Sequence, residues 1–116
     1  MLFWRVSIFL IFILTINTAL AQESDDPGGF KAVMTFTVNS ANDTNDGTCN
    51  ASHCSLREAI NASNANPDKD TIAFNIAGMP PFTIQPATPL PLIFNPVIID
   101  GATQPGFSGV PLIVLN

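Results

Sequence analysis

Basic residues are scarce in this chain, which carries four lysines and arginines against nine aspartates and glutamates among its 116 residues. A protein that binds nucleic acid needs a basic face to pair with the phosphates. The formal net charge is instead −5, so we expect no nucleic-acid partner.

Charged residues of either sign almost disappear from the second half of the chain. Between Thr71 and Asn116 the one charged residue is Asp100. Glycoside hydrolysis needs two carboxylates that flank the scissile bond, and this half supplies only one. We therefore expect the chain to hold no catalytic constellation of its own.

The N-terminal segment is almost wholly apolar after a single positive charge. The letters MLFWR are followed by VSIFLIFILTINTALA, a run shorter than the roughly 20 residues that a membrane-spanning helix needs. Its Ala-Leu-Ala ending is the small-residue pattern that a signal peptidase accepts. We predict a signal peptide at 1–21, cleaved between Ala21 and Gln22, and a secreted or cell-surface chain with no membrane span after cleavage. An uncleaved membrane anchor is the alternative, and residues 22–34 are predicted to be a flexible lead-in.

Export would place the two cysteines in an oxidising compartment. Cys49 and Cys54 are therefore predicted to form one disulfide. A redox pair is the alternative, but such a motif places two residues between its cysteines, and here there are four. His53 could join them as a zinc ligand, but zinc takes three or four ligands and the chain has no other histidine or cysteine. We expect His53 to be a solvated loop residue, and we expect no zinc cofactor.

A helix is predicted directly after the second cysteine. Ser55 and Glu58 have the spacing of a capping box, in which each side chain accepts a hydrogen bond from the other residue's backbone N–H. Apolar residues follow at helical spacing, namely Leu56, Ala59 and Ile60. Pro67 ends the pattern.

The rest of the chain predicts short strands separated by proline and glycine turns. The strand-like segments are MTFTVNS before the helix and DTIAFNI, PFTIQ, NPVIIDG and PLIVLN after it. Isoleucines 72, 84, 98 and 113 recur at similar intervals, which is typical of stacked coils in a β-solenoid. We expect a mainly β fold over 35–116, made of opening solenoid coils behind one short capping helix. The apolar last coil would leave an open β-edge that self-associates or binds a partner.

Two polar features allow other interpretations. Asp43, Asn45 and Asp46 offer hard oxygens in a turn and are weak candidates for calcium ligands. Gly47 comes one position too early for an EF-type loop, so an acidic surface turn is the preferred interpretation. Arg57 is expected to lie across the first coil, on Asp70 or on backbone carbonyls.

The stretch CSLREAI resembles the signature of the CSLREA domain. It consists of Cys54, Ser55, Leu56, Arg57, Glu58, Ala59 and Ile60. The flanking text FTVNSANDTNDGTC and NASNANPDKDTIAFNI is also similar, so the resemblance covers about Phe36 to Asn116. It implies a place near the N-terminus of a large exported bacterial or archaeal surface protein. It also implies a right-handed parallel β-helix, similar to that of pectate lyases, but no defined activity.

Two functional hypotheses follow. The first is a non-catalytic cap at the N-terminal end of a β-helix surface protein, used for adhesion or surface display, with extracellular polysaccharide or surface proteins as partners. The alternative is the N-terminal piece of a β-helix polysaccharide lyase or glycosidase whose catalytic residues lie beyond Asn116. The chain is predicted to be truncated, and the alternative is a native protein that pairs its open edge with a partner. On either functional hypothesis the isolated chain is expected to show no turnover of pectin or alginate.

Overall fold

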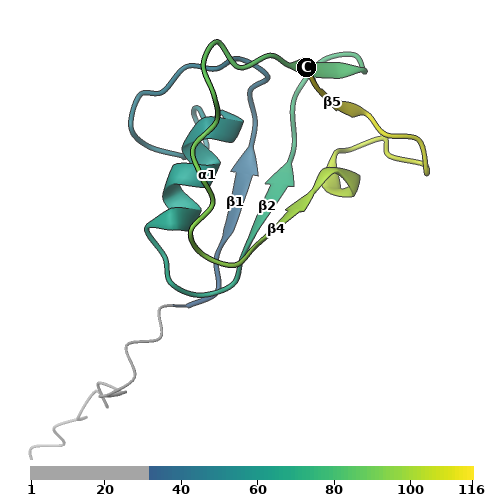
Figure 1. Ribbon diagram of the computed structural model, residues 1–116. Coiled ribbons are helices and arrows are strands. Elements are labelled where there is room, and N and C mark those ends of the chain that lie inside the picture. The colour runs from purple at the N-terminus through teal and green to yellow at the C-terminus, as the bar shows by residue number, and fades with distance from the viewer. Residues whose placement is uncertain (1–31) are drawn as a thin grey trace, which may run out of the picture.

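The computed structural model describes residues 32–116, which contain five short strands, one α-helix and one 3-10 helix (Figure 1). In chain order these are β1 (Thr35–Val38), α1 (Leu56–Asn64), β2 (Asp70–Phe74), β3 (Phe82–Ile84), β4 (Val97–Asp100), η1 (Gly101–Thr103) and β5 (Ile113–Leu115). The predicted signal peptide at 1–21 and most of the predicted lead-in lie outside the described residues. Within 32–116, no helix is long and apolar enough to cross a membrane.

The strands form two small sheets, and every pair of neighbouring strands is parallel. β1, β2 and β4 form one sheet in that order, and β3 pairs with β5 in the other. In the central strand β2 the alternate residues Asp70, Ile72 and Phe74 are buried. This period of two places one face of the strand on the core.

The helix α1 begins at the capping box. Ser55 is the N-cap, its side chain accepts a hydrogen bond from the Glu58 N–H, and the Glu58 side chain accepts one from the Ser55 N–H. These two bonds satisfy backbone donors that have no partner within the helix. α1 ends at Asn64, shortly before Pro67, whose ring cannot continue a helix.

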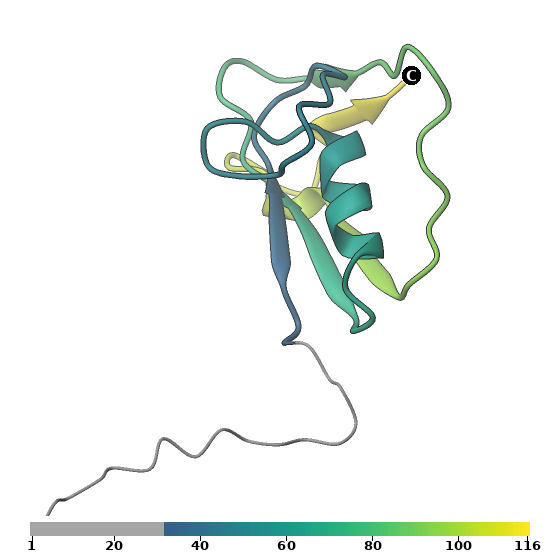
Figure 2. The same cartoon turned by 90° about the vertical axis from the view of Figure 1, so that its left-hand side faces the viewer.

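The hydrophobic core lies where α1 packs against β1 and β2 (Figures 1 and 2). Its buried members are Val38, Cys54, Leu56, Ala59, Ile60, Ile72, Phe74, Ile76, Phe82 and Ile84. The apolar stripe of the helix is therefore buried because it covers one face of the parallel sheet.

Residues 85–96 run past α1 without regular secondary structure and lead into β4 (Figure 2). The Asn64 side chain holds this segment at the end of the helix. Its amide donates to the Leu92 carbonyl at 2.7 Å, and its oxygen accepts from the Phe94 N–H at 2.9 Å. The segment is therefore ordered by side-chain hydrogen bonds rather than by a strand ladder.

The prediction of a β-solenoid, as the opening coils of a right-handed parallel β-helix, is wrong. Residues 32–116 form a small unit of two short parallel sheets and one helix, with no stacked coils. The isoleucines that recur at similar intervals do not form one row, because residues 72 and 98 lie in one sheet whereas 84 and 113 lie in the other. The connections between strands also differ. The connection from β1 to β2 contains α1, whereas the connection from β3 to β4 is the irregular segment 85–96. Similar spacing in the sequence therefore did not reflect a structural repeat.

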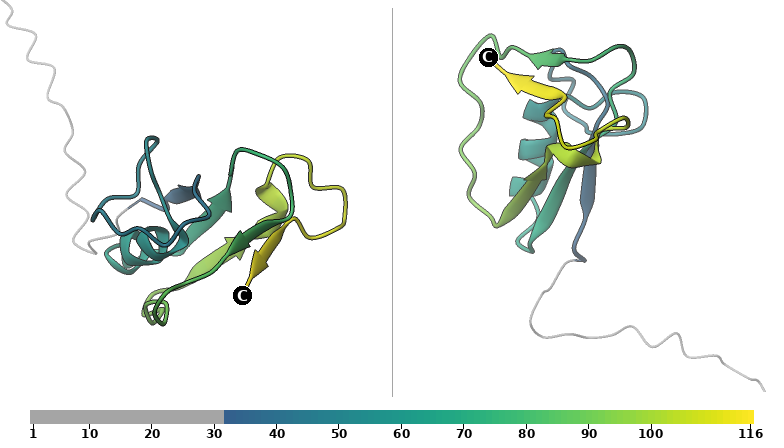
Figure 3. Two further views of the ribbon diagram at one scale, coloured as in Figure 1. Left: turned by 90° about the horizontal axis from the view of Figure 1, so that it is seen from above. Right: turned by 90° about the vertical axis from the view of Figure 1, so that its right-hand side faces the viewer.

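The core is covered unequally at its two sides. In β4, Ile99 lies opposite Ile72 in the register, yet Ile99 is 46% exposed whereas Ile72 is fully buried. In β5, Leu115 lies opposite Ile84, and their exposed fractions are 58% and 1%. β4 and β5 lie on the side of the molecule away from β1 (Figure 3, right). We call the exposed side chains of Ile98, Ile99, Val114 and Leu115 the open end.

Candidate functional site

The polar loop between β1 and α1 is closed by a disulfide and by one asparagine. Cys49 and Cys54 form the disulfide, with their Cα atoms 4.3 Å apart. Asn39 lies across the base of the loop, where its side-chain oxygen accepts from the Cys54 N–H at 2.7 Å. Its amide donates to the carbonyls of Asn50 and Ala51. These contacts fix the position of His53, which directly precedes Cys54.

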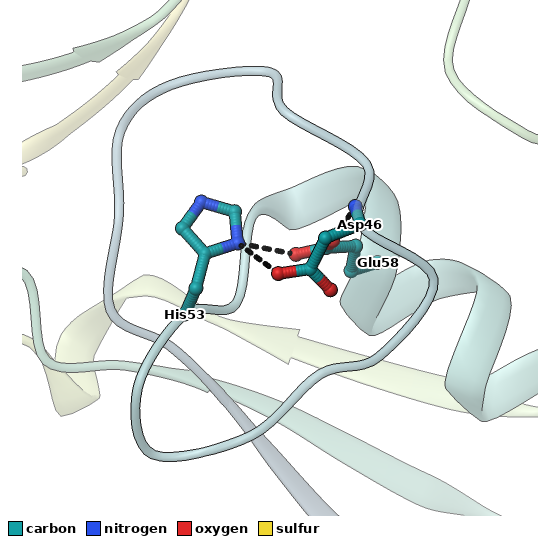
Figure 4. Close-up of side chains that lie close together, drawn as sticks. All are labelled: Asp46, His53 and Glu58. Carbon is teal, nitrogen blue, oxygen red and sulfur yellow. Dashed lines mark hydrogen bonds and ion pairs between the residues drawn. The ribbon is translucent and has the colours of Figure 1, made fainter.

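The imidazole of His53 faces the carboxylates of Asp46 and Glu58 (Figure 4), and its other side faces Asn42. Its Nε2 is 2.9 Å from Asn42 Oδ1, and the Thr44 N–H donates to that same oxygen. Because this oxygen can only accept, Nε2 must carry the proton. The other ring nitrogen, Nδ1, is 3.0 Å from Glu58 Oε2 and 3.5 Å from Asp46 Oδ2.

Glu58 is held in place by backbone donors on two sides. Its Oε2 accepts from the Ser55 N–H at 2.9 Å, and its Oε1 accepts from the Asp46 N–H at 2.6 Å. The side chain is only 1% exposed. The Glu58 carboxylate therefore has two structural roles. It completes the capping box at the start of α1, and it also binds the loop between β1 and α1.

Asp46 completes the cluster from the solvent side. Its Oδ1 accepts hydrogen bonds from the backbone N–H and the hydroxyl of Thr48, which lower the pKa of this carboxyl below its ordinary value. Its Oδ2 faces the imidazole, and the side chain is 47% exposed. One ligand-type atom from each of Asp46, His53 and Glu58 lies within 4.8 Å of the other two. This arrangement can hold a positive charge, either as a proton on Nδ1 or as a metal ion.

His53 lies in a loop, as expected, but its side chain is not freely solvated, because only 21% of it is exposed. Sequence inspection missed the cluster since its members are separated by several residues and no local periodicity joins them. The one available signal was Glu58, whose role in a capping box directs its carboxylate back toward the preceding loop.

The weak calcium candidates Asp43, Asn45 and Asp46 each have different surroundings. Asp43 lies on Arg57, with Nε at 3.0 Å from Oδ1 and Nη2 at 2.9 Å from Oδ2. Its Oδ2 also accepts from the Ala87 N–H. Asn45 lines a hollow that also contacts Glu58, and Asp46 belongs to the histidine cluster. The paired geometry of Arg57 and the Ala87 N–H keep the pKa of Asp43 below its ordinary value.

Arg57 binds carbonyl groups, as expected, but it does not contact Asp70. Its Nη1 and Nη2 donate to the carbonyls of Pro89 and Thr88 at 2.9 and 2.8 Å. It therefore ties the segment 85–96 to the loop. Asp70 is buried elsewhere, where its Oδ1 accepts from the Met34 N–H and from the Asn66 amide.

Comparison with known proteins gave no match to a family model, to a curated protein or to a solved structure. The functional argument therefore depends on the geometry of the fold and of the cluster.

Proposed function

We propose that this chain is a non-catalytic structural module of an exported surface protein, and that its open end associates with a second copy of the chain. The apolar segment that ends at Ala21 supports export, as does the disulfide between Cys49 and Cys54. The similarity of Cys54–Ile60 to the CSLREA signature supports a place among CSLREA domains. In this proposal the module serves adhesion or surface display.

The single observation that carries the proposal is the apolar core that is uncovered at one side. Ile99 and Leu115 extend the rows of Ile72 and Ile84, which are buried. Burying such side chains stabilises a complex by about 25 cal/mol for each Å² of apolar surface removed from water. Exposed apolar side chains that continue a buried core are typical of a protein interaction site.

The opposite side of the core is covered by the segment that contains the CSLREA-like stretch Cys54–Ile60. Val38, Cys54 and Ala59 are fully buried there, and the disulfide fixes the loop that leads into α1. This asymmetry suits a module whose one side is a permanent cap and whose other side receives a partner.

A second copy fits the open end by its charge and by its strand edges. The chain from Thr71 onward carries Asp100 and no basic residue, so two such faces approach with little repulsion and an acidic polysaccharide finds no cation there. β4 and β5 are edge strands within residues 32–116. Their unpaired backbone groups can pair with another strand.

Sedimentation velocity over a concentration series tests the association. The chain is expected to sediment as a monomer when dilute and as a dimer when concentrated. Ile99→Lys places a charge on the open end and is expected to keep the chain monomeric throughout. Leu92→Lys is the matched control, since Leu92 is exposed on the segment beside α1, and it should dimerise like the unaltered chain. A monomer at every concentration would refute the proposal, as would equal loss of association in both variants.

A further inference from the structure

We propose that Asp46, His53 and Glu58 bind a divalent transition-metal ion, and that Zn²⁺ is the ion best suited to this donor set. Imidazole nitrogen and carboxylate oxygen are ordinary zinc ligands. The sequence argued against zinc because it offers one histidine beside two paired cysteines. The fold changes that argument, since it brings two carboxylates to the same imidazole nitrogen.

The spacing of the donor atoms fits a small metal ion. Zinc bonds to nitrogen and oxygen of about 2.0–2.2 Å place the donors of a tetrahedral site roughly 3.3–3.6 Å apart. The observed distances from His53 Nδ1 are 3.0 Å to Glu58 Oε2 and 3.5 Å to Asp46 Oδ2. All three donors lie within 4.8 Å of one another, so modest side-chain movement closes the site.

The histidine is already oriented as a metal ligand. Histidines that bind metal usually donate their other ring N–H to a fixed acceptor, which sets the tautomer. Here Nε2 donates to Asn42 Oδ1, whose acceptor role is fixed by the Thr44 N–H. In the neutral ring, Nδ1 therefore presents its lone pair to the cluster.

The Nδ1 atom gives an independent indication that this cluster can bind a cation. It is shielded from solvent and, among the described residues, has no hydrogen-bond partner of acceptable geometry, although two carboxylate oxygens lie near it. A lone pair directed at two anionic oxygens is repulsive. A metal ion bound to Nδ1 and to the two carboxylate oxygens replaces this repulsion with three coordination bonds. The competing explanation of the close contact is a second proton on the ring, carried by Nδ1.

The site has both a rigid and an accessible side. Glu58 is buried and held by two backbone N–H groups, so it needs little reorganisation on binding. Asp46 is half exposed, so an ion can enter from solvent and a water molecule can occupy the fourth position. The bound ion would join the loop to the start of α1 close to the disulfide, as a second cross-link.

Metal titration of the full chain, recovered without a histidine tag from an exporting host, tests the site. Isothermal titration with Zn²⁺ is expected to show one ion per chain. Co²⁺ is expected to give the visible absorption of a low-coordinate site, and Zn²⁺ should abolish it. His53→Gln and Asp46→Asn should both remove binding, and Asn42→Ala should weaken it by about 10- to 100-fold. Asp68→Asn is the matched control, because it removes one carboxylate beyond the other end of α1 and should leave the affinity unchanged.

A ring-nitrogen NMR measurement on His53 separates the metal from the competing proton. Zn²⁺ is expected to shift Nδ1 while Nε2 keeps its proton. No Zn²⁺ binding by the unaltered chain, or equal binding by His53→Gln, would overturn the inference. The Ile99→Lys variant should bind Zn²⁺ normally, so failure of this site and failure of the proposed association are distinguishable.

Discussion

The Glu58 carboxylate is the group whose removal should most disturb the closed side of the molecule. In Glu58→Ala, the Ser55 N–H loses its acceptor at 2.9 Å and the Asp46 N–H loses its acceptor at 2.6 Å. Ser55 is fully buried, so water cannot replace the first hydrogen bond. Asp46 is exposed, so water can replace the second.

The expected magnitude follows from these two environments. A buried donor left without an acceptor costs about 1–3 kcal/mol, and a donor that water can reach costs much less. We expect Glu58→Ala to lower the free energy of unfolding by about 2–3 kcal/mol. Ser55→Ala removes only the reciprocal hydrogen bond, which the Glu58 N–H donates to the Ser55 hydroxyl, and should cost about 1 kcal/mol.

Urea unfolding followed by far-ultraviolet circular dichroism measures both values under oxidising conditions. Asn61→Ala, at an exposed position of the same helix, is the control and should change the free energy by less than about 0.5 kcal/mol. If Glu58→Ala cost no more than Ser55→Ala, the claim that Glu58 holds the loop as well as the helix would be refuted.

Three further predictions concern the disulfide, pH and the core. Reducing the disulfide should lower the free energy of unfolding by about 2 kcal/mol, because its short loop restricts the unfolded chain only modestly; an unchanged urea midpoint would contradict this. The pKa of Asp43 is lowered in the folded state. Its carboxylate therefore stabilises the fold fully at pH values above its unfolded pKa near 3.8, and this stabilisation is lost as pH falls through the folded pKa. Melting temperature should therefore drop in that acidic range, and Asp43→Asn should reduce the drop. Ile72→Ala should cost about 2–5 kcal/mol because it leaves a cavity, whereas Ile99→Ala should cost much less in the monomer; equal losses in urea unfolding would refute the difference in burial.

The local features that the sequence predicted depend on residues close together in the chain. The capping box needs only Ser55 and Glu58, three positions apart, because a helix turn brings them together. The disulfide needs only the chain's two cysteines. The strand β2 lies within the predicted strand-like segment DTIAFNI. Each of these rules operates within one element, so sequence spacing is sufficient.

The fold class could not be predicted in this way, because spacing along the chain does not say which strands pair. The isoleucine interval suggested one stacked row, but the register places Ile72 opposite Ile99 and Ile84 opposite Leu115, in separate sheets. Strand pairing is decided by contacts between distant residues, and several pairings satisfy the same apolar pattern.

The sequence by itself was sufficient to predict the start of the helix and the disulfide. It also shows the scarcity of charged residues after Thr71, and it predicts export. Only the tertiary structure decided that Arg57 binds Asp43 rather than Asp70, and that His53 lies between Asp46 and Glu58. The physical reason is that a long polar loop can close in many ways. The disulfide and the backbone donors that hold Glu58 select one of them, and that choice positions the cluster.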